Sequence, residues 1–579
     1  MLRIVDLRIN SRTMCGRISL SLRVYIFVIM AFVMMPTAYA QPKDVERKRD
    51  DFDLGRATEI LANMMRELEG GFVDEISADV LLQAAARGML IASDPYTEYL
   101  SEESMEAFEM MTTGRYGGVG SLIRKKGDYV IFAQPYKGSP SDVAGIKIGD
   151  KILSIGGEDM RGATTADVSS RLRGEAKTDV EVVVERNIDS SIDTLTLRRQ
   201  RITVPSVNYY GMLHSGIGYI SHNDFIEGSY DEMRRAVEVL MQGDSLKGLV
   251  LDYRTNGGGV MQEAVDIASL FVPRGEQIVS IMGRDSSSLH HYTTRHAPIA
   301  QDIPVVVLVG GASASASEIL AGALQDLDRA VVMGSRTYGK GLVQGTRYLG
   351  YNTYLKYTTA KYYIPSGRCI QSRNYAAMRS DGAATNVPDS LITEFATRGG
   401  RRVYDGGGIV PDVKIEPTYV SGFTVALYAQ GYIEDWADIY MRTHHSDNID
   451  VESFTISDAD YADFCHFIED KEVVYESESR KALKTLESAL KKELYDENVG
   501  EVMESLKSLI HDDKMSNLET YRKDIIDAIN ADIILRYAYN SGVLQHAAAN
   551  DEVVAQAVAL LLDREEYQRI LREQHLDMH

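Results

Sequence analysis

A cluster of serine residues lies where a predicted buried strand ends and a predicted helix begins. The apolar run 303–310 is followed by a segment of small residues that carries Ser313, Ser315 and Ser317. A helix that opens at these serines would expose a hydroxyl above a sheet and leave its first backbone N–H groups free to bind an anion. A nucleophile beside such donors is suited to acyl transfer, although serines at a helix start are, taken alone, more often caps.

A lysine follows the next predicted strand, 330–335, in a tight Gly-Lys-Gly turn centred on Lys340. No histidine lies between His296 and His444, so Lys340 is the natural candidate for the base that a serine needs. An amine acts as a base only when it is neutral, and its pKa must fall from about 10.4 to about 7 or 8, which requires an enclosed apolar setting. Gln344 could orient the amine if the turn continued into a helix.

Strands and helices alternate around these turns, over residues 205 to 415. Such alternation predicts a largely parallel sheet built from βαβ units, with sites at the carboxyl ends of its strands. The predicted strands are 217–222, 246–254, 303–310 and 330–335, and the predicted helices are 231–242, 263–272 and 315–326.

The segments on either side of this core have different patterns of apolar and polar residues. Residues 41–112 have helical periodicity, and residues 113–190 read as a β-rich module with one helix, 165–174. Beyond Pro417 the chain is helical and acidic to residue 579, which favours packing or dimerisation over chemistry. Its run 553–562 is apolar enough to require burial.

Composition narrows the classes of function. A chain of 579 residues can form several domains, and a net charge of -22 leaves no basic face for nucleic acid. Cys369 and Cys465 are too few to form a disulfide scaffold, and no ligand spacing suggests a metal. The sequence leaves open whether these two thiols pair.

Residues 1–40 read as an export signal. Five arginines precede the apolar run 24–35, and the small residues at 38–40 predict cleavage before Gln41. The alternatives are an uncleaved anchor and a true start at Met14. We expect a periplasmic or cell-envelope protein with no stable membrane span after cleavage, because no later segment has eighteen uncharged apolar residues.

Several motifs, in one order, resemble the C-terminal processing peptidases, also called tail-specific proteases. This family consists of serine peptidases that carry a PDZ domain, and the similarity runs from about residue 55 to 415. The motifs are LDYRTNGGG (251–259), ASASASEILAGALQD (312–326), GSRTYGKGLVQ (334–344), YYIPSGRCIQ (362–371) and GGIVPDV (407–413).

Carried over position by position, the resemblance implies a Ser-Lys dyad. Ser315 would be the nucleophile, Lys340 the general base and Gln344 the residue that orients the base. Ser313 and Ser317 would be structural.

The loop 251–259 resembles the family loop that contributes an oxyanion N–H group. Gly257 or Gly258, beside Ala316, would then hold the tetrahedral oxygen. The chain has Tyr253, Gly257 and Cys369 where leucine, proline and serine are more common. These departures leave the catalytic roles in place, although Gly257 loosens the loop.

The β-rich module resembles a PDZ domain, in its segments 115–123 and 138–160. Such a domain captures a C-terminal carboxylate in backbone N–H groups and pairs the peptide with a strand edge. Arg173 is a candidate for contact with the catalytic core. The implied carboxylate-binding residues are Tyr116, Gly117, Gly118, Val119 and Gly120.

The resemblance implies an α/β multidomain fold with an inserted PDZ domain and a crotonase-like core. The expected domains are a signal peptide 1–40, an N-terminal helical subdomain 41–112, a PDZ domain 113–190, a peptidase core 200–416 and a helical extension 417–579 that could form a homodimer. We expect a serine endopeptidase that uses no cofactor and cuts exported proteins near free C-termini. The alternatives are a non-catalytic scaffold of the same folds and an acyltransferase or hydrolase of small substrates.

Overall fold

The computed structural model describes residues 42–243, 246–375, 385–444, 448–493, 495–510 and 513–572. The predicted signal segment 1–40 lies outside the described residues. The chain divides into two compact units, 1–88 and 89–579.

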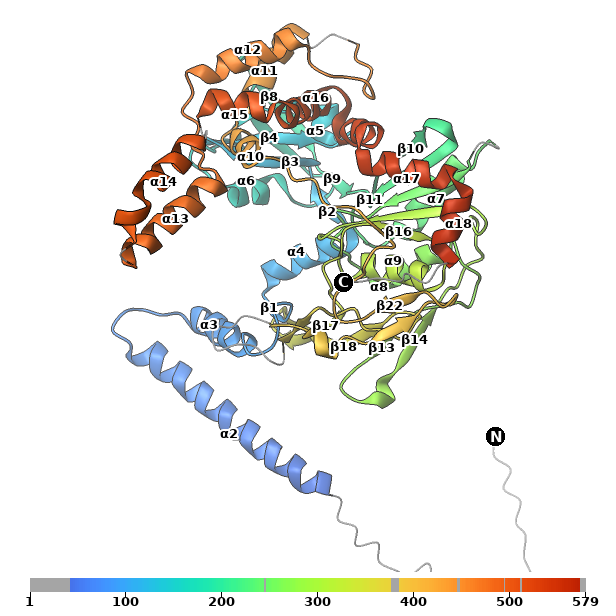
Figure 1. Cartoon of the computed structure of the whole chain (residues 1–579). Helices are drawn as coiled ribbons and strands as arrows, with labels where there is room; N and C mark the ends of the chain where they lie inside the picture. The colour runs from blue at the N-terminus through green and yellow to red at the C-terminus, as the bar shows by residue number, and fades with distance from the viewer. Residues whose placement is uncertain are drawn as a thin grey trace, which may run out of the picture. The chain divides into compact units, whose positions relative to one another are not determined.

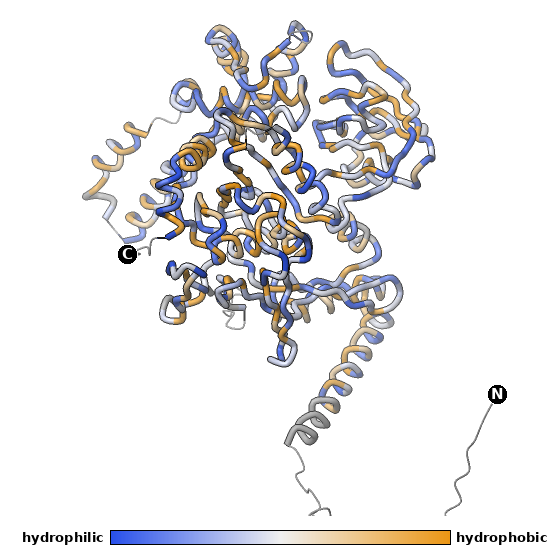
Figure 2. The backbone as a smooth tube through the Cα atoms, turned by 90° about the vertical axis from the view of Figure 1, so that its right-hand side faces the viewer, coloured by the Kyte–Doolittle hydropathy of each residue, from blue (hydrophilic) through white to orange (hydrophobic). Residues whose placement is uncertain are grey.

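The first unit is helical. It contains helix α2 (Pro42–Gly71) and most of helix α3 (Ala78–Leu90). Apolar and polar residues alternate along α2 (Figure 2), and Phe52, Ile60 and Met64 on this helix are exposed.

The second unit is built around a six-stranded sheet. Strand β10 is antiparallel to β11, and the remaining neighbours are parallel, as predicted for βαβ units. The apolar run Val305–Val309 forms a central strand because both of its neighbours are parallel and both faces are buried. In sheet order the strands are β10 (Val207–Leu213), β11 (Ile217–His222), β12 (Gly248–Asp252), β15 (Val305–Val309), β16 (Val331–Gly334) and β23 (Val413–Lys414).

Helices cover both faces of this sheet (Figure 1). Alternate strand residues, such as Val305 and Val307, pack against α7 (Ser229–Leu240), α8 (Met261–Ala268) and α9 (Ala316–Asp326). The residues between them, such as Val306, pack against α17 (Glu552–Leu562) and α18 (Arg564–Arg572). One face of the apolar run 553–562, with Val554, Ala557 and Leu561, is therefore buried against the sheet, and the end of the helical extension forms one layer of this core.

A second, antiparallel sheet lies on the far side of α9 (Figure 1). All eleven residues of α9 are buried, and the helix contacts β16 of the first sheet and β13 of the second. The strands of the second sheet are β1 (Glu98–Leu100), β13 (Gln277–Met282), β14 (His290–Thr293), β17 (Leu342–Gly350) and β18 (Thr353–Tyr363).

Strand β1 departs from the expected helical subdomain 41–112. Its residues Glu98–Leu100 pair with β18, so that Glu98 lies opposite Lys356. Pairing with a strand far along the chain stabilises an extended segment that local periodicity assigned to helix. Helix α4 (Glu102–Thr113) then leads out of this sheet, so the module that follows is inserted into the core.

The inserted module has the β-rich texture that the sequence predicts. Its sheet has the order β3-β4-β5-β7-β8, its core lies around Val130, Phe132 and Val182, and strand β2 pairs separately with β9. The module extends to Thr203, beyond the predicted limit of 190. Its main elements are β2 (Arg115–Gly118), β3 (Ser121–Lys126), β4 (Tyr129–Pro135), β5 (Lys151–Ile155), α6 (Thr165–Leu172), β7 (Asp179–Glu185), β8 (Ile192–Arg198) and β9 (Gln200–Thr203).

The helical extension begins with its own core, in which Trp436 packs edge-on against Phe464. In the described part of the chain no helix combines the length and apolar character needed to cross a bilayer. The helices of the helical extension that precede α17 are α10 (Gly422–Ala429), α11 (Tyr432–His444), α12 (Asp458–Glu469), α13 (Glu478–Lys492), α14 (Asp496–Leu509), α15 (Lys514–Thr520) and α16 (Arg522–Asn550).

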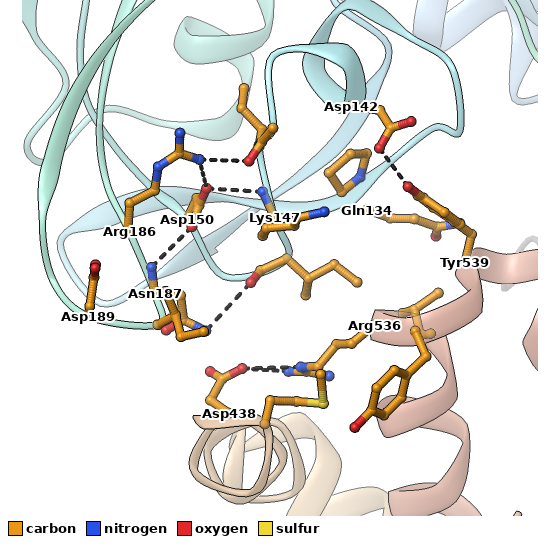
Figure 3. Close-up of a pocket in the computed structure, with 18 of the residues that line it drawn as sticks. Gln134, Asp142, Lys147, Asp150, Arg186, Asn187, Asp189, Asp438, Arg536 and Tyr539 are labelled. Atoms are coloured by element: carbon orange, nitrogen blue, oxygen red, sulfur yellow. Dashed lines mark hydrogen bonds and ion pairs between the residues drawn. The ribbon is translucent and has the colours of Figure 1, made fainter. Parts of the chain in front are cut away.

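Polar contacts join the inserted module to this extension. Arg124 of β3 pairs with Glu434 of α11, and Lys126 lies 2.6 Å from Asp435. Tyr539 of α16 donates a hydrogen bond to Asp142 at 2.6 Å across a cavity of about 570 Å³ (Figure 3). The module is thereby held from the side of the extension as well as by its two connections to the core.

Truncating one buried leucine of α17 should destabilise the core. Leu561 is fully buried against the sheet, whereas its neighbour Leu562 is 43% exposed. We expect Leu561→Ala to lower the free energy of unfolding by about 2 to 5 kcal/mol, because it leaves a cavity. Leu562→Ala serves as the matched control, with an effect of about 0.5 kcal/mol or less. Urea denaturation followed by circular dichroism measures both, and equal midpoints would contradict the packing described.

Candidate active site

Ser315 sits between β15 and α9, as the residue that caps the helix. Its backbone has φ 57° and ψ −115°, a conformation that costs a non-glycine residue of order 1 to 3 kcal/mol. Such strain persists only where the surroundings over-determine it, and it is concentrated at functional sites. Ser315 is half-buried, whereas Ala314 and Ala316 on either side are buried.

The flanking serines are engaged in the framework. Ser313 Oγ donates to the carbonyl of Tyr253 at 2.7 Å, and Ser317 Oγ donates to Asn256 Oδ1 at 2.8 Å. Both side chains are fully buried. These contacts fit the structural roles predicted for Ser313 and Ser317.

The glycine loop after β12 touches the nucleophile turn. A Cβ atom added to Gly258, where φ is +101°, would lie 2.8 Å from Ser315 Cβ and 2.9 Å from Ala316 N. The loop therefore approaches as closely as a glycine allows. This contact places the predicted oxyanion residues against the helix start.

The structure separates the two candidate donors in this loop. Gly258 N–H is used, since it donates to Asn256 Oδ1 at 2.8 Å, whereas within the described residues Gly257 N–H has no partner. Asn256 also donates to the carbonyl of His222 at 2.8 Å, so its buried amide fixes the loop. Of the two glycines, the geometry favours Gly257 as the donor that accompanies Ala316.

Lys340 lies in the turn between β16 and β17. Its Nζ is 4.4 Å from the centroid of the Tyr96 ring, a cation–π distance. In the described part of the chain it makes no hydrogen bond with Ser315 or Gln344. Burial lowers the pKa of Lys340, and the nearby charge of Lys356 lowers it further.

The turn at Lys340 does not continue into a helix, which was the condition under which Gln344 could orient the amine. Residues Leu342–Gly350 form β17, and Gln344 donates to Thr358 Oγ1 of β18 at 3.3 Å. Pairing with β18 extends this segment, and four extended residues span about 13 Å. In this conformation Gln344 therefore does not orient the lysine.

Glu318 joins the two catalytic turns, a role that sequence reasoning missed. One oxygen, Oε2, accepts hydrogen bonds from the backbone N–H of Ser315 at 2.8 Å and of Lys340 at 2.9 Å. The other, Oε1, accepts from Gly339 N–H at 2.7 Å and from the Thr337 hydroxyl. The nitrogens of residues 315 and 340 thus lie within two hydrogen-bond lengths of each other. The available signal was a serine followed three residues later by a glutamate, the pattern of a capping box.

Tyr362 completes the link from the opposite side. Its hydroxyl, fully buried at the end of β18, lies 3.2 Å from the carbonyl oxygen of Ser315 and also contacts that of Lys340. The two turns are therefore fastened through their N–H groups and through their carbonyls.

The predicted carboxylate-binding loop of the inserted module is divided between two settings. Tyr116, Gly117 and Gly118 belong to β2 and pair with β9, whereas Val119 and Gly120 follow the strand. Arg173 stacks over the Tyr116 ring at 5.3 Å and contacts Met110 of α4. In this structure Arg173 thus meets the connecting helix instead of the catalytic turns.

Cys369 and Cys465, whose pairing the sequence left open, are both free thiols. The described residues hold no group of three or more His, Cys, Asp or Glu side chains arranged for a metal ion.

Comparison with known proteins identifies the class. The profile of Peptidase family S41 matches residues 216–376, a PDZ domain profile matches 131–186, and the profile named "Probable PDZ-protease, C-terminal helical domain" matches 423–561. The chain thus combines a segment similar to Peptidase family S41 with segments similar to a PDZ domain and to the C-terminal helical domain of probable PDZ-proteases.

Its relatives specify the family. A carboxy-terminal-processing protease of Bartonella bacilliformis is 35% identical over 295 residues, which cover 50% of this chain and 67% of the relative. A probable CtpA-like serine protease of Staphylococcus aureus is 35% identical over 316 residues, 54% of this chain and 62% of the relative. The chain belongs to the carboxy-terminal-processing proteases of peptidase family S41.

Two further facts delimit the comparison. The match spans less than two thirds of the length of the Staphylococcus relative. The photosystem II D1 C-terminal processing protease is 29% identical with a TM-score of 0.33, covering 62% of this chain and 87% of that one, and a score this low adds nothing to the assignment.

Adding a methyl group to the glycine loop should disable the site. In Gly258→Ala the new Cβ would clash with Ala314 O and with Ser315, so we expect peptide hydrolysis to fall by about a hundredfold or more. The matched control is Gly311→Ala, since nothing lies within 4 Å of a Cβ built there. Rates on a fluorogenic peptide measure both, and a Gly258→Ala enzyme of normal rate would contradict the close approach.

Proposed function

We propose that the protein is a serine endopeptidase in which Ser315 is the nucleophile and Lys340 the general base. The observation that carries this proposal is the shared oxygen of Glu318, which binds the backbone N–H groups of both residues. Two side chains suited to acyl transfer thereby extend from turns that are fixed to each other. The strained conformation of Ser315 adds support.

In the first step the neutral amine of Lys340 takes the proton from Ser315 Oγ. The oxygen attacks the carbonyl carbon of the scissile peptide, a C–O bond forms, and the carbonyl oxygen becomes an oxyanion. The first N–H groups of α9, led by Ala316, and the N–H of Gly257 face this charge. Such donors are each worth about a hundredfold or more in rate.

In the second step the ammonium of Lys340 returns its proton to the leaving nitrogen. The C–N bond breaks, the C-terminal fragment departs and an acyl group stays on Ser315. The lysine, neutral again, then takes a proton from water, which hydrolyses the ester and restores the serine. No metal or cofactor takes part in this scheme.

Before the first step, the Lys340 side chain has to leave the face of Tyr96. A ring face stabilises the charged amine, whereas proton abstraction requires the neutral one. The conformation described here is therefore a resting arrangement of the base. In this proposal, rotation about the side-chain bonds of Lys340 redirects the amine toward Ser315.

The inserted PDZ domain supplies the selection of substrates. We propose that it binds the free carboxylate of a protein tail at the loop of residues 116–120, in which Val119 and Gly120 follow β2. Strand β3 lies at one edge of the PDZ sheet, whose order is β3-β4-β5-β7-β8, so a protein tail can pair with it through backbone hydrogen bonds. The substrates would then be proteins cut near their C-termini.

Several further assignments belong to this proposal. The catalytic core is crotonase-like, residues 1–40 are an export signal, and the protein works in the periplasm or cell envelope on exported proteins. The surface of the extension that remains for a homodimer contact lies outside α17 and α18, which cover the core sheet, and outside the parts of α11 and α16 that contact the PDZ domain.

Removing either member of the dyad should abolish proteolysis. We expect Ser315→Ala and Lys340→Ala each to lower casein cleavage by about 10⁴-fold or more, with circular dichroism unchanged. Lys340→Arg should be equally inactive, because arginine stays protonated. EDTA should leave the wild-type rate intact. Cleavage at the wild-type rate in either alanine variant would remove that residue from the mechanism and favour a binding scaffold.

Selection by the tail should depend on its terminal charge. We expect a peptide with a free C-terminal carboxylate to be cleaved at least about tenfold more efficiently, by kcat/KM, than the same peptide with a C-terminal amide. The amide removes the negative charge and places an N–H donor against the N–H groups of the loop. Equal efficiencies would show that the PDZ domain does not read the carboxylate.

A further inference from the structure

We infer that Glu318 is a positioning residue whose ionised carboxylate holds the nucleophile turn and the base turn in register. The inference rests on the proposed Ser-Lys chemistry and concerns what makes that site competent. Glu318 does not touch substrate in this scheme, and it acts through the backbones of Ser315 and Lys340.

The Glu318 carboxylate accepts hydrogen bonds at both of its oxygens. Glu318 is fully buried, and each of its oxygens accepts two hydrogen bonds, from the four donors at 315, 337, 339 and 340. Three of these donors come from the single turn that carries the base, and the fourth is the nucleophile itself. Losing the acceptor would leave buried N–H groups unpaired, each at a cost of about 1 to 3 kcal/mol.

A protonated Glu318 finds no hydrogen-bond acceptor for its proton unless these contacts rearrange. Backbone N–H groups only donate, so none of the three can accept a hydrogen bond. The Thr337 hydroxyl already accepts from Ile409 N–H at 2.7 Å and donates to Glu318, so it could accept the Glu318 proton only by turning its own hydrogen away from the carboxylate. Protonation therefore sets a donor against donors and loosens one of the two turns.

The Glu318 carboxyl gains and loses its proton near neutral pH. Burial raises the pKa of Glu318 to about 7, and the hydrogen bonds from Thr337, Lys340, Gly339 and Ser315 oppose that rise. Within the described residues the titratable groups that bear on this carboxylate are the Lys340 amine and the Tyr362 hydroxyl. As the pH falls through about 7, Glu318 becomes protonated and the register of the turns is lost.

Two groups must then be deprotonated for activity, and they differ in role. Lys340 must be neutral to accept the serine proton, and Glu318 must be charged to hold both turns. The acid side of the pH profile of kcat should consequently fall with a slope of up to two protons. The charge of Glu318 also raises the pKa of Lys340, so a neutral residue at 318 should move the remaining limb to lower pH.

The experiment compares Glu318→Gln and Glu318→Asp with the wild type and with Glu232→Gln. Glu232 is the matched control, because its carboxylate also accepts three hydrogen bonds, from Ser206 N–H, Ser206 Oγ and Val207 N–H, away from the catalytic turns. The readouts are kcat and KM on a fluorogenic peptide from about pH 5 to 9, and the rate at which a fluorophosphonate labels Ser315.

For Glu318→Gln we expect kcat and the labelling rate to fall about 10- to 1,000-fold, with KM within about threefold of the wild type. In this variant the acid side of the pH profile of kcat should fall with a slope of one proton and should lie at lower pH than in the wild type. Glu318→Asp retains the charge on a shorter side chain, so it should keep the two-proton limb with a lower plateau. Glu232→Gln should match the wild type in both the plateau and the shape of the profile.

The inference is overturned if Glu318→Gln keeps the wild-type kcat, or if its profile keeps the wild-type shape while only the plateau falls. If Glu318→Gln does not fold, as judged by circular dichroism, the aspartate variant decides, and a one-proton limb in that variant overturns the inference.

Ser315→Ala and Lys340→Ala, assayed alongside, distinguish failure of the role of Glu318 from failure of the proposed function. If both are inactive while Glu318→Gln behaves as wild type, only the role of Glu318 falls. If Ser315→Ala still cleaves, the proposed function itself falls.

Discussion

The complete burial of helix α9 is the constraint on which the rest of the site depends. A helix between two sheets cannot shift without disturbing both, so the residue at its start is held wherever the helix places it. The helix is fixed at its far end as well, since Asp326 pairs with Arg368 at 2.8 Å and both side chains are buried. This rigidity explains how a serine at positive φ is maintained.

The same burial makes polar contacts decisive. Asn256 holds the glycine loop, and Glu318 holds the base turn, each with a side chain removed from water. In such surroundings an unpaired donor is costly, so each contact selects one arrangement of the turns. The lysine amine is the exception, because it lies over the ring of Tyr96 and, in the described part of the chain, makes no hydrogen bond with Ser315 or Gln344. The proposed mechanism thus pairs a rigidly held nucleophile with a base whose side chain has to move.

Segments from both ends of the second unit complete the catalytic core. Strand β1, ahead of the PDZ domain, pairs with β18, and helices α17 and α18, near the C-terminus, cover the central sheet. The PDZ domain is therefore inserted between two pieces of one core, and ion pairs from β3 join it to α11. A tail bound at β3 would lie on the strand that the helical extension contacts. The proposed tail binding and the observed domain contact would thereby share one strand of the PDZ domain.

The sequence by itself determined the βαβ core, the β-rich module and the family, because hydrophobic periodicity and short motifs are local properties. It also placed Ser315, Lys340 and the glycine loop at neighbouring strand ends. Only the tertiary structure decided that residues 98–100 form a strand, that Gln344 lies in β17, and that Gly258 N–H is already used. The strand at 98–100 depends on β18, far along the chain, and the place of Gln344 depends on the pairing of β17 with β18. The partner of Gly258 N–H, Asn256, is only two residues away, but its side chain is held by contacts with His222 and Ser317, which are distant in the sequence. The carboxylate of Glu318 lies beside Lys340, 22 positions further along the chain, because the segment between them folds back through β16, and no local pattern reports that return.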